Sequence, residues 1–357
     1  MKLKQETLAR LFAAGLFVGL LVPIGLFRLG INLAGPAAGQ SPSIELHGRM
    51  PESGGWLPAD LEARVGTPLR LRLTSNDVVH SFAVGQTDWP VIQVEPGKFT
   101  ETELVFERPG KYIYYCTRWC GPNHWRMRGV IQVSGPGEVP QAGLPLYLEL
   151  GLDLDAPHPA AAVPESAPSA AAGQHWLMSV PERYKTGEYY ASHSPSAAFL
   201  ALRSEPALAG LPDQSIWDLT AALWGTNATP AALETGRELY DQNCAACHGE
   251  AGRGDGVMVR YLEAQPGAGE EAGHSAGAGT GHAGEGPSFS GHEIIAPVDF
   301  TDPAAMLGAS PALLHGKIVR GGMGTGMPYW GPVFTDEQVW ALTAYLWTFT
   351  LNLESDQ

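Results

Sequence analysis

The stretch YCTRWCGPNHWRM, residues 115–127, concentrates side chains that bind metals. Its metal-binding residues are Cys116, Cys120, His124 and Met127, and a further histidine, His80, lies upstream in NDVVHSF. Two thiolates, two imidazoles and a thioether form a soft ligand set that suits copper, whereas structural zinc sites use four Cys or His ligands. A mononuclear blue-copper site needs one cysteine, so the second predicts that both sulfurs bridge two copper ions, each bound by one histidine. The alternative, a disulfide between the two cysteines, leaves the His and Met spacing unexplained.

The other two cysteines of the chain, Cys244 and Cys247, belong to CAACH, residues 244–248. C-x-x-C-H is the attachment pattern of a c-type haem. Two thiols one helical turn apart add to the two vinyl groups, and His248 follows directly to bind the iron. The alternative is a free redox dithiol, but the trailing histidine argues against it.

The sixth iron ligand should be a soft atom further along the chain, and GGMGTGMPYWG offers Met323 and Met327. Residues from about 229 to 350 resemble a class I cytochrome c domain. Gly236 and Tyr240 match its N-terminal helix, GRGDG matches the loop after the haem motif, and Met-Pro matches the axial loop. The resemblance therefore favours Met327, and a His/Met ligand pair raises the potential of a haem.

The copper stretch, together with His80, closely resembles the binuclear CuA site of cytochrome c oxidase subunit II. That family carries the site on an all-β cupredoxin Greek-key barrel, and the match covers about residues 43–135. The resemblance implies one ligand set: His80, Cys116, the backbone carbonyl of Arg118, Cys120, His124 and Met127.

This sequence departs from the family pattern in two places. The family usually has an acidic or amide residue at the position of Arg118, where the side chain helps to hold a magnesium ion at the interface with subunit I. An arginine cannot do this, so no magnesium site is expected. The aromatic cluster that precedes the first histidine ligand, associated with docking of soluble cytochrome c, is also missing.

Strands must position the copper stretch. LRLRLTS, residues 69–75, alternates Leu and Arg as a half-buried strand does. GKYIYYC, residues 110–116, follows a Pro-Gly turn, and RGVIQV, residues 128–133, comes after the copper stretch. The spacing of strands and turns predicts a sandwich or small barrel, with the copper stretch as a loop between two strands.

Helices must position the haem motif. Thr229 is a suitable N-cap and Pro230 suits the first helical position, ahead of ALETGRELYDQNC. The C-terminal stretch TDEQVWALTAYLWTF begins with Thr335, and Gln338 three residues later predicts a capping box. The sequence therefore predicts a C-terminal all-α domain that contains CAACH.

The N-terminal segment, residues 1–35, reads as a single transmembrane helix. Leu11 to Phe27 run without a charge after Lys2, Lys4 and Arg10, and 17 residues are near the lower limit for a span. The basic flank predicts a cytoplasmic N-terminus in the cell membrane, with the large C-terminal portion on the periplasmic or extracellular side. The alternative is a cleaved signal peptide, which exports the rest of the chain equally.

The remaining segments complete a multidomain chain. Residues 136–175 read as an Ala/Pro-rich linker, and residues 229–352 form the cytochrome c domain with a Gly/Ala-rich insertion at 265–286. Residues 176–228 read as helical. IWDLTAALW at 216–224 aligns with VWALTAYLW near the C-terminus, which is compatible with a degenerate cytochrome c-like unit or with two amphipathic helices of similar composition.

Composition narrows the function. The formal net charge of −15 over 357 residues argues against a nucleic-acid partner, because phosphates would be repelled.

The order of the three segments, a membrane anchor, a CuA cupredoxin and a cytochrome c domain, resembles subunit II of a caa-type cytochrome c oxidase. The resemblance implies a chain with no catalytic residues of its own, a haem–copper catalytic subunit I as membrane partner, and a donor such as a cytochrome c, a small copper protein or a quinol-oxidising complex. The alternatives are the same role in a CuA-containing nitric oxide reductase and a stand-alone membrane-anchored electron carrier.

Overall fold

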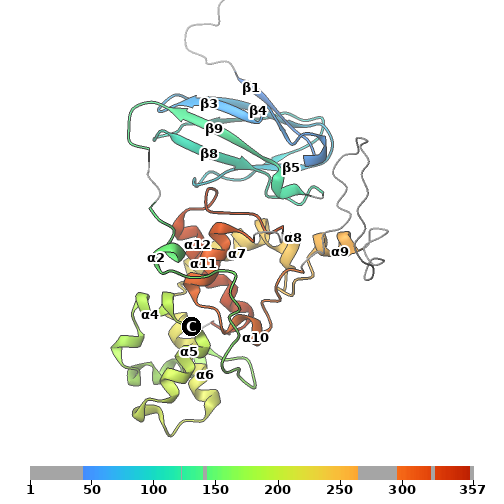
Figure 1. Cartoon of the computed structure of the whole chain (residues 1–357). Coiled ribbons are helices and arrows are strands. Elements are labelled where there is room, and N and C mark those ends of the chain that lie inside the picture. Colours follow the sequence, from blue (N-terminus) through green and yellow to red (C-terminus); the bar gives the residue numbers. More distant parts are fainter. Residues whose placement is uncertain (1–42, 122, 140–142, 264–295, 323–325, 354–357) are drawn as a thin grey trace, which may run out of the picture.

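The structure, a computed structural model, describes residues 43–121, 123–139, 143–263, 296–322 and 326–353. Figure 1 shows a β-rich part, built from the first third of the chain, stacked on a helical part built from the rest. The predicted order of an all-β domain before an all-α domain is thus confirmed. The predicted transmembrane helix lies outside the described residues, and within those ranges no helix is both long and apolar enough to cross a bilayer.

The β-rich part consists of two sheets that share one core. One sheet has the strand order β2-β1-β4-β7 and the other β3-β9-β8-β5-β6. Pairs β1/β4 and β3/β9 are parallel, and the other pairs are antiparallel. The strands are β1 (Ile44–Gly48), β2 (Trp56–Leu57), β3 (Asp60–Arg64), β4 (Leu69–Ser75), β5 (His80–Val84), β6 (Ile92–Val94), β7 (Thr100–Leu104), β8 (Gly110–Tyr115) and β9 (Arg128–Ser134).

Alternation explains why β4 forms where it was predicted. Leu71 and Leu73 point into the core between the sheets, at 1% and 0% exposure. Arg72, between them, points to the other face and pairs with Glu45 on β1 and Glu101 on β7. A two-residue period of this kind is what a sheet with one buried face requires.

The helical part contains helices of 4 to 14 residues. The α-helices are α2 (Leu146–Glu149), α3 (Ala170–Gly173), α4 (Gly187–Ser192), α5 (Pro195–Arg203), α6 (Asp213–Gly225), α7 (Pro230–Asn243), α8 (Ala245–His248), α9 (Val257–Glu263), α10 (Pro303–Met306), α11 (Pro311–Arg320) and α12 (Asp336–Leu346). The 3₁₀ turns of the helical part are η3 (Gln174–Ser179), η4 (Glu182–Tyr184), η5 (Pro206–Leu208) and η6 (Trp347–Phe349). Two further 3₁₀ turns, η1 (Pro51–Ser53) and η2 (His124–Arg126), lie in the β-rich part.

Helices α7 and α12 pack closely against each other, and α7 ends directly before the haem motif in the sequence. Both predicted caps are confirmed: Thr229 accepts from the Ala232 amide, and Thr335 forms a capping box with Gln338. Gly236 lets the two helices approach, because a Cβ at that position would lie 2.3 Å from the Ala341 carbonyl oxygen. The crossing fixes the end of α7, where CAACH begins.

The segment from residue 143 to residue 226 packs against the cytochrome-like helices in one continuous core. Leu154 and Ala170 are buried in the same hydrophobic cluster as Trp224 and Trp347, and Arg320 on α11 forms two hydrogen bonds with the Asp155 carboxylate. The stretch predicted as a linker therefore contributes buried residues to the helical part. The domain boundaries given above remain predictions.

Candidate metal centres

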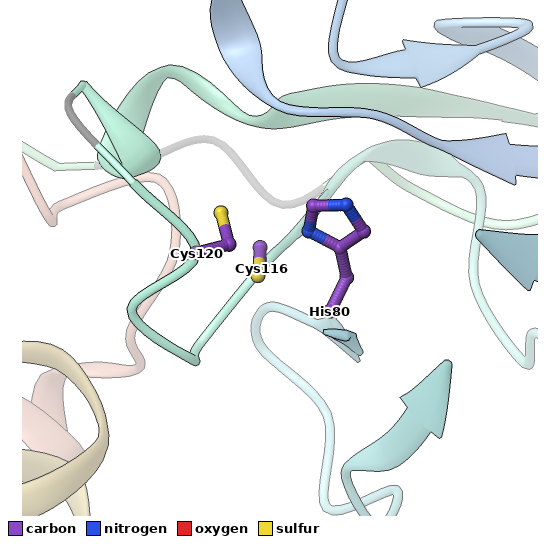
Figure 2. A group of neighbouring side chains, drawn as sticks. All are labelled: His80, Cys116 and Cys120. Carbon is purple, nitrogen blue, oxygen red and sulfur yellow. The ribbon is translucent and has the colours of Figure 1, made fainter. Parts of the chain in front are cut away.

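Three strand ends bring the predicted copper ligands together. His80 begins β5, Cys116 directly follows β8, and Met127 directly precedes β9. Because β8 is antiparallel to both neighbours, these ends lie at one edge of the sheet. The metal-binding atoms of His80, Cys116 and Cys120 lie within 4.8 Å of one another, and Figure 2 shows the three side chains.

The loop between β8 and β9 is closed on itself. The Cys116 amide donates to the Met127 carbonyl at 3.1 Å, so both loop ends are held beside the sheet. Within the loop, Asn123 has a positive φ of 58°, which short polar side chains tolerate, and η2 follows with His124 buried at 4% exposure.

His80 is oriented by a carboxylate. Its Nε2 lies 2.7 Å from Asp77 Oδ1, and that carboxylate also accepts from the Met50 and Val78 amides. A carboxylate only accepts, so Nε2 carries the proton and Nδ1 has a free lone pair. Nδ1 is buried and has no hydrogen-bond partner among the described residues. A carboxylate–histidine pair with an unpaired ring nitrogen is the arrangement in which imidazole binds a metal.

The two thiols form a coupled pair. The neighbouring Cys120 thiol lowers the pKa of Cys116 against the opposing effect of burial, and His124 and His80 act in the same direction as Cys120. The Cys116 interaction, together with burial, raises the pKa of Cys120. Burial opposes the charged form of His80, but the nearby Cys116 thiol and the Asp77 carboxylate more than offset that effect and raise the pKa of His80.

The remaining predicted ligands surround this pair. Cys116 Sγ lies 3.2 Å from the Arg118 carbonyl oxygen, and Cys120 Sγ lies 4.0 Å from Met127 Sδ. The Nδ1 atom of His124 is buried without a partner in the described part of the chain. The structure thus brings His80, Cys116 and Cys120 together, with the Arg118 carbonyl and Met127 Sδ next to the thiols, and these groups fit copper; the role of His124 as a ligand remains a prediction.

The haem motif lies at the junction of α7 and α8. Cys244 and Cys247 are free thiols, and burial raises the pKa of Cys244 to about 12 and that of Cys247 to about 11. His248 stacks on Phe300 with ring centroids 4.5 Å apart. Burial lowers the pKa of His248 to about 4, partly offset by a hydrogen bond with the Val298 backbone. Two protonated thiols that form no disulfide, beside a neutral imidazole, fit covalent attachment of a haem.

The axial loop leads away from α11. Met327 is half-buried and packs against the helical core, and its carbonyl accepts from the Gly322 amide at 3.1 Å. Met323 lies outside the described residues, so the preference for Met327 remains a prediction.

A cleft of about 730 Å³ lies between the β-rich and helical parts beside these centres. His80, Arg118 and Trp119 line it from the copper side, and residues of α8 and α9 line it from the haem side. The cleft therefore lies between the copper ligand loop and the helices that flank the haem motif.

The sequence analysis missed the contacts that join the two parts. Tyr115 packs edge-on against Trp330 with centroids 6.3 Å apart, and Arg128 donates from Nη1 to the Tyr329 carbonyl oxygen at 3.1 Å. The only signal in the sequence was their position, because Tyr115 precedes the first ligand and Arg128 follows the last. Asp77 was also missed, although it stands three residues before His80.

Both parts match known families. Residues 60–134 match the family model described as cytochrome C oxidase subunit II, periplasmic domain, and residues 233–350 match the one described as cytochrome c. Cytochrome c oxidase subunit 2 of Thermus thermophilus is 37% identical over 80 residues, which are 22% of this chain and 58% of that protein. A second, longer form of that subunit from the same species is 37% identical over 80 residues, or 47% of its length. This chain thus spans about half the length of the curated relatives it matches.

One solved structure that matches part of this chain is the periplasmic domain of subunit II of cytochrome oxidase (CoxB) of Bradyrhizobium japonicum. It is 21% identical, and the match covers 28% of this chain and 86% of that one with a TM-score of 0.23, a score too low to carry an argument. The family matches and the geometry agree. The chain joins a cupredoxin domain of the cytochrome c oxidase subunit II type, which implies a CuA copper centre, to a cytochrome c domain, which implies one covalent haem c.

Proposed function

We propose that this chain is the subunit through which electrons enter a haem–copper terminal oxidase, from a donor to haem c, then to CuA, then to the catalytic subunit that reduces oxygen. The observation that carries the proposal is the placement of both centres in one chain, with the residues next to the copper ligands in contact with the axial loop of the cytochrome domain. When bound, haem c and the copper pair each accept and release one electron.

The protein groups at the copper site favour electron transfer over bond chemistry. Cys116, Cys120, His80 and His124 would hold the copper pair, and Met127 and the Arg118 carbonyl would complete the ligand set. His80 and Met127 are fully buried, and Cys116 is 3% exposed. A closed and rigid ligand set leaves no position for substrate and changes little on reduction, so the chain acts as a non-catalytic component of an oxidoreductase complex.

The residues of the haem motif are also arranged to hold a cofactor. Cys244 and Cys247 would attach the porphyrin, and His248 and Met327 would hold its iron. Phe300 holds the His248 ring by stacking, and burial keeps that imidazole neutral, which is the form that binds iron.

The proposed complex places the chain at the cell membrane. Residues 1–35 form its single span with a cytoplasmic N-terminus, and both metal domains lie on the periplasmic or extracellular side. Its partners are the membrane-embedded subunit I and a donor such as a cytochrome c, a small copper protein or a quinol-oxidising complex.

The test is oxygen consumption by the native detergent-extracted complex with a reduced donor. Wild-type complex should consume oxygen, and the Cys120→Ser complex should reduce its haem c at the wild-type rate but lose oxygen consumption. Equal oxygen consumption by both complexes would show that electrons do not pass through the copper site.

Arg118 favours a second candidate, the same electron-input role in a nitric oxide reductase that contains CuA. Its guanidinium stands where the oxidase family has an acidic or amide side chain for magnesium, and it lines the cleft between the two parts. Supplying the same complex with nitric oxide in place of oxygen separates the candidates. Turnover with nitric oxide alone would favour the reductase.

A further inference from the structure

One row of side chains on the β-rich part faces away from its own core. Ala83 on β5 pairs with Tyr115 on β8, and Tyr115 pairs with Arg128 on β9. Neighbouring Tyr114 points the other way, into the core between the sheets. Ala83 and Tyr115 instead belong to the hydrophobic cluster of the helical part. Alternation along three adjacent strands therefore presents this row to the cytochrome domain.

The surface that meets this row is the segment just after Met327. The Gln86 amide donates to the Val333 carbonyl at 2.8 Å, and a Cβ on Gly85 would lie 2.6 Å from that same carbonyl oxygen. The segment is tied to α11 as well, since the Trp330 amide donates to Ile318. The two parts are thus in tight backbone contact beside the axial loop.

Arg128 is the charged member of the row. Its guanidinium lies over the Tyr329 and Trp330 rings, 5.4 and 4.9 Å from their centroids, while Nη1 donates to the Tyr329 carbonyl at 3.1 Å. Nη2 is buried without an acceptor in the described part of the chain. Within that part no carboxylate forms an ion pair with Arg128. A positive charge is therefore held at this interface by aromatic faces and one carbonyl.

The two residues that form this contact stand next to or near the assigned ligands in the sequence. Arg128 directly follows Met127, and Tyr329 stands two residues after Met327. One hydrogen bond thus links the copper ligand loop to the axial loop of the haem.

We propose that Arg128 is a positioning residue for electron transfer within the chain: it locks the axial loop of the cytochrome domain onto the copper ligand loop, and its charge favours the reduced state of both centres. The proposal rests on the relay function above. Its two parts are separable, because a lysine keeps the charge but lacks the planar fork and the stacking surface of arginine.

The experiment compares three variants in the detergent-solubilised full chain loaded with copper and haem. Arg128→Met removes the charge and the hydrogen-bond donors with a side chain of similar length, whereas Arg128→Lys keeps the charge. Arg126→Met is the control: it makes the same Arg-to-Met change at an exposed arginine that precedes Met127. The haem is reduced by an added photosensitiser and sacrificial electron donor in a short light pulse, and the arrival of the electron at copper is followed by absorbance. Reduction potentials of both centres are measured separately.

We expect Arg128→Met to slow the transfer about tenfold, the effect of losing one hydrogen bond to a charged group on a docking equilibrium, and to lower both potentials. Arg128→Lys should slow the transfer but keep the potentials near wild type, and Arg126→Met should change neither. In the metal-free, haem-free chain, Arg128→Met should also speed hydrogen exchange at the Trp330 to Val333 amides.

An Arg128→Met chain that transfers electrons as fast as the Arg126→Met chain would overturn the proposal, even if its loop exchanges faster. A wild-type chain that shows no transfer from haem to copper would instead refute the relay function, and this proposal with it.

Discussion

Asp77 is the side chain on which the orientation of His80 depends. Its carboxylate holds Nε2 and two backbone amides at once, so it fixes the ring with Nδ1 toward the two cysteines. Groups that hydrogen-bond to a metal ligand affect metal affinity almost as strongly as the ligands do, because they select the tautomer and the ring orientation of the histidine.

Asp77→Ala should therefore weaken copper binding about 10- to 100-fold. Competition with a copper chelator of known affinity measures the change. Glu101→Ala is the matched control, since that carboxylate lies on β7 at 77% exposure and does not contact His80. Equal affinities in the two variants would show that Asp77 does not support the copper site.

Cys120→Ser tests the bridging role. If both sulfurs hold both coppers, losing one thiolate should reduce the copper content from about two ions to about one per chain and abolish the EPR signature of an electron shared by two coppers. Haem content should stay unchanged, because Cys244 and Cys247 lie in the other domain. Retention of two coppers with a shared electron would contradict the bridging assignment.

For single residues, the sequence predicted the candidate copper ligands but not the side chains that orient them. Five of the six ligand groups fall within one loop of twelve residues, so their spacing alone indicates their chemistry. Asp77 acts through its contact with His80, and Arg128 through a domain that packs on the outer face of the sheet. Contacts of this kind leave no periodic pattern in the sequence.

Helices α10 and α11 show how the Ala/Pro-rich segment is held. Gly308, between them, lies so close to the backbone of residues 158–160 that a Cβ would be 2.0 Å from the His158 carbonyl oxygen. The obstacle is backbone, which cannot turn aside as a flexible side chain would.

Gly308→Ala should accordingly destabilise the helical part by about 1–3 kcal/mol, the usual cost of overpacking, and should expose residues 156–165 to proteolysis. Gly210→Ala is the control, because a Cβ there has nothing within 4 Å, and its free energy of unfolding should change by less than about 0.5 kcal/mol. Urea unfolding measures both. Equal stability of the variants would mean that this segment is not packed as the structure has it.

His315 on α11 makes the stability of the helical part depend on pH. Burial lowers its pKa, although Asp336, 3.0 Å away, acts in the opposite direction. The unfolded chain therefore binds a proton near the ordinary histidine pKa of about 6.5, while the folded chain does so only at lower pH. This stabilisation is present above pH 6.5 and is lost as the pH falls toward the folded-state pKa.

His315→Gln should therefore reduce the difference in unfolding free energy between pH 7.5 and pH 5.5. Exposed His193, changed in the same way, controls for removal of a histidine from this part. An unchanged difference in His315→Gln would contradict the account of a buried neutral imidazole.

Elements with a periodic pattern were predicted well from the sequence. β4 begins and ends where its alternation does, and α7 and α12 begin at their predicted caps. The packing of residues 143–170 could not be predicted in the same way. Alanine and proline give no amphipathic period, and the groove that receives this segment is formed by Gly308 and by helices more than a hundred residues away.

In the part of the chain that the structure describes, the β-rich and helical parts have separate cores, and Figure 1 shows one part stacked on the other. Fusing donor and acceptor in one chain removes the diffusional search between them and raises their effective concentration. The acidic net charge of −15 suits docking of a basic donor protein.

Under the proposed function, this one chain holds both centres and passes electrons between them. The most direct measurement is an anaerobic reductive titration of the purified full chain, with metal analysis and visible and EPR spectra on the same sample. The account predicts two coppers, one iron and an uptake of two electrons, with electrons moving between haem and copper after partial reduction. A single copper, a missing covalent haem, or two centres that do not exchange electrons would contradict it.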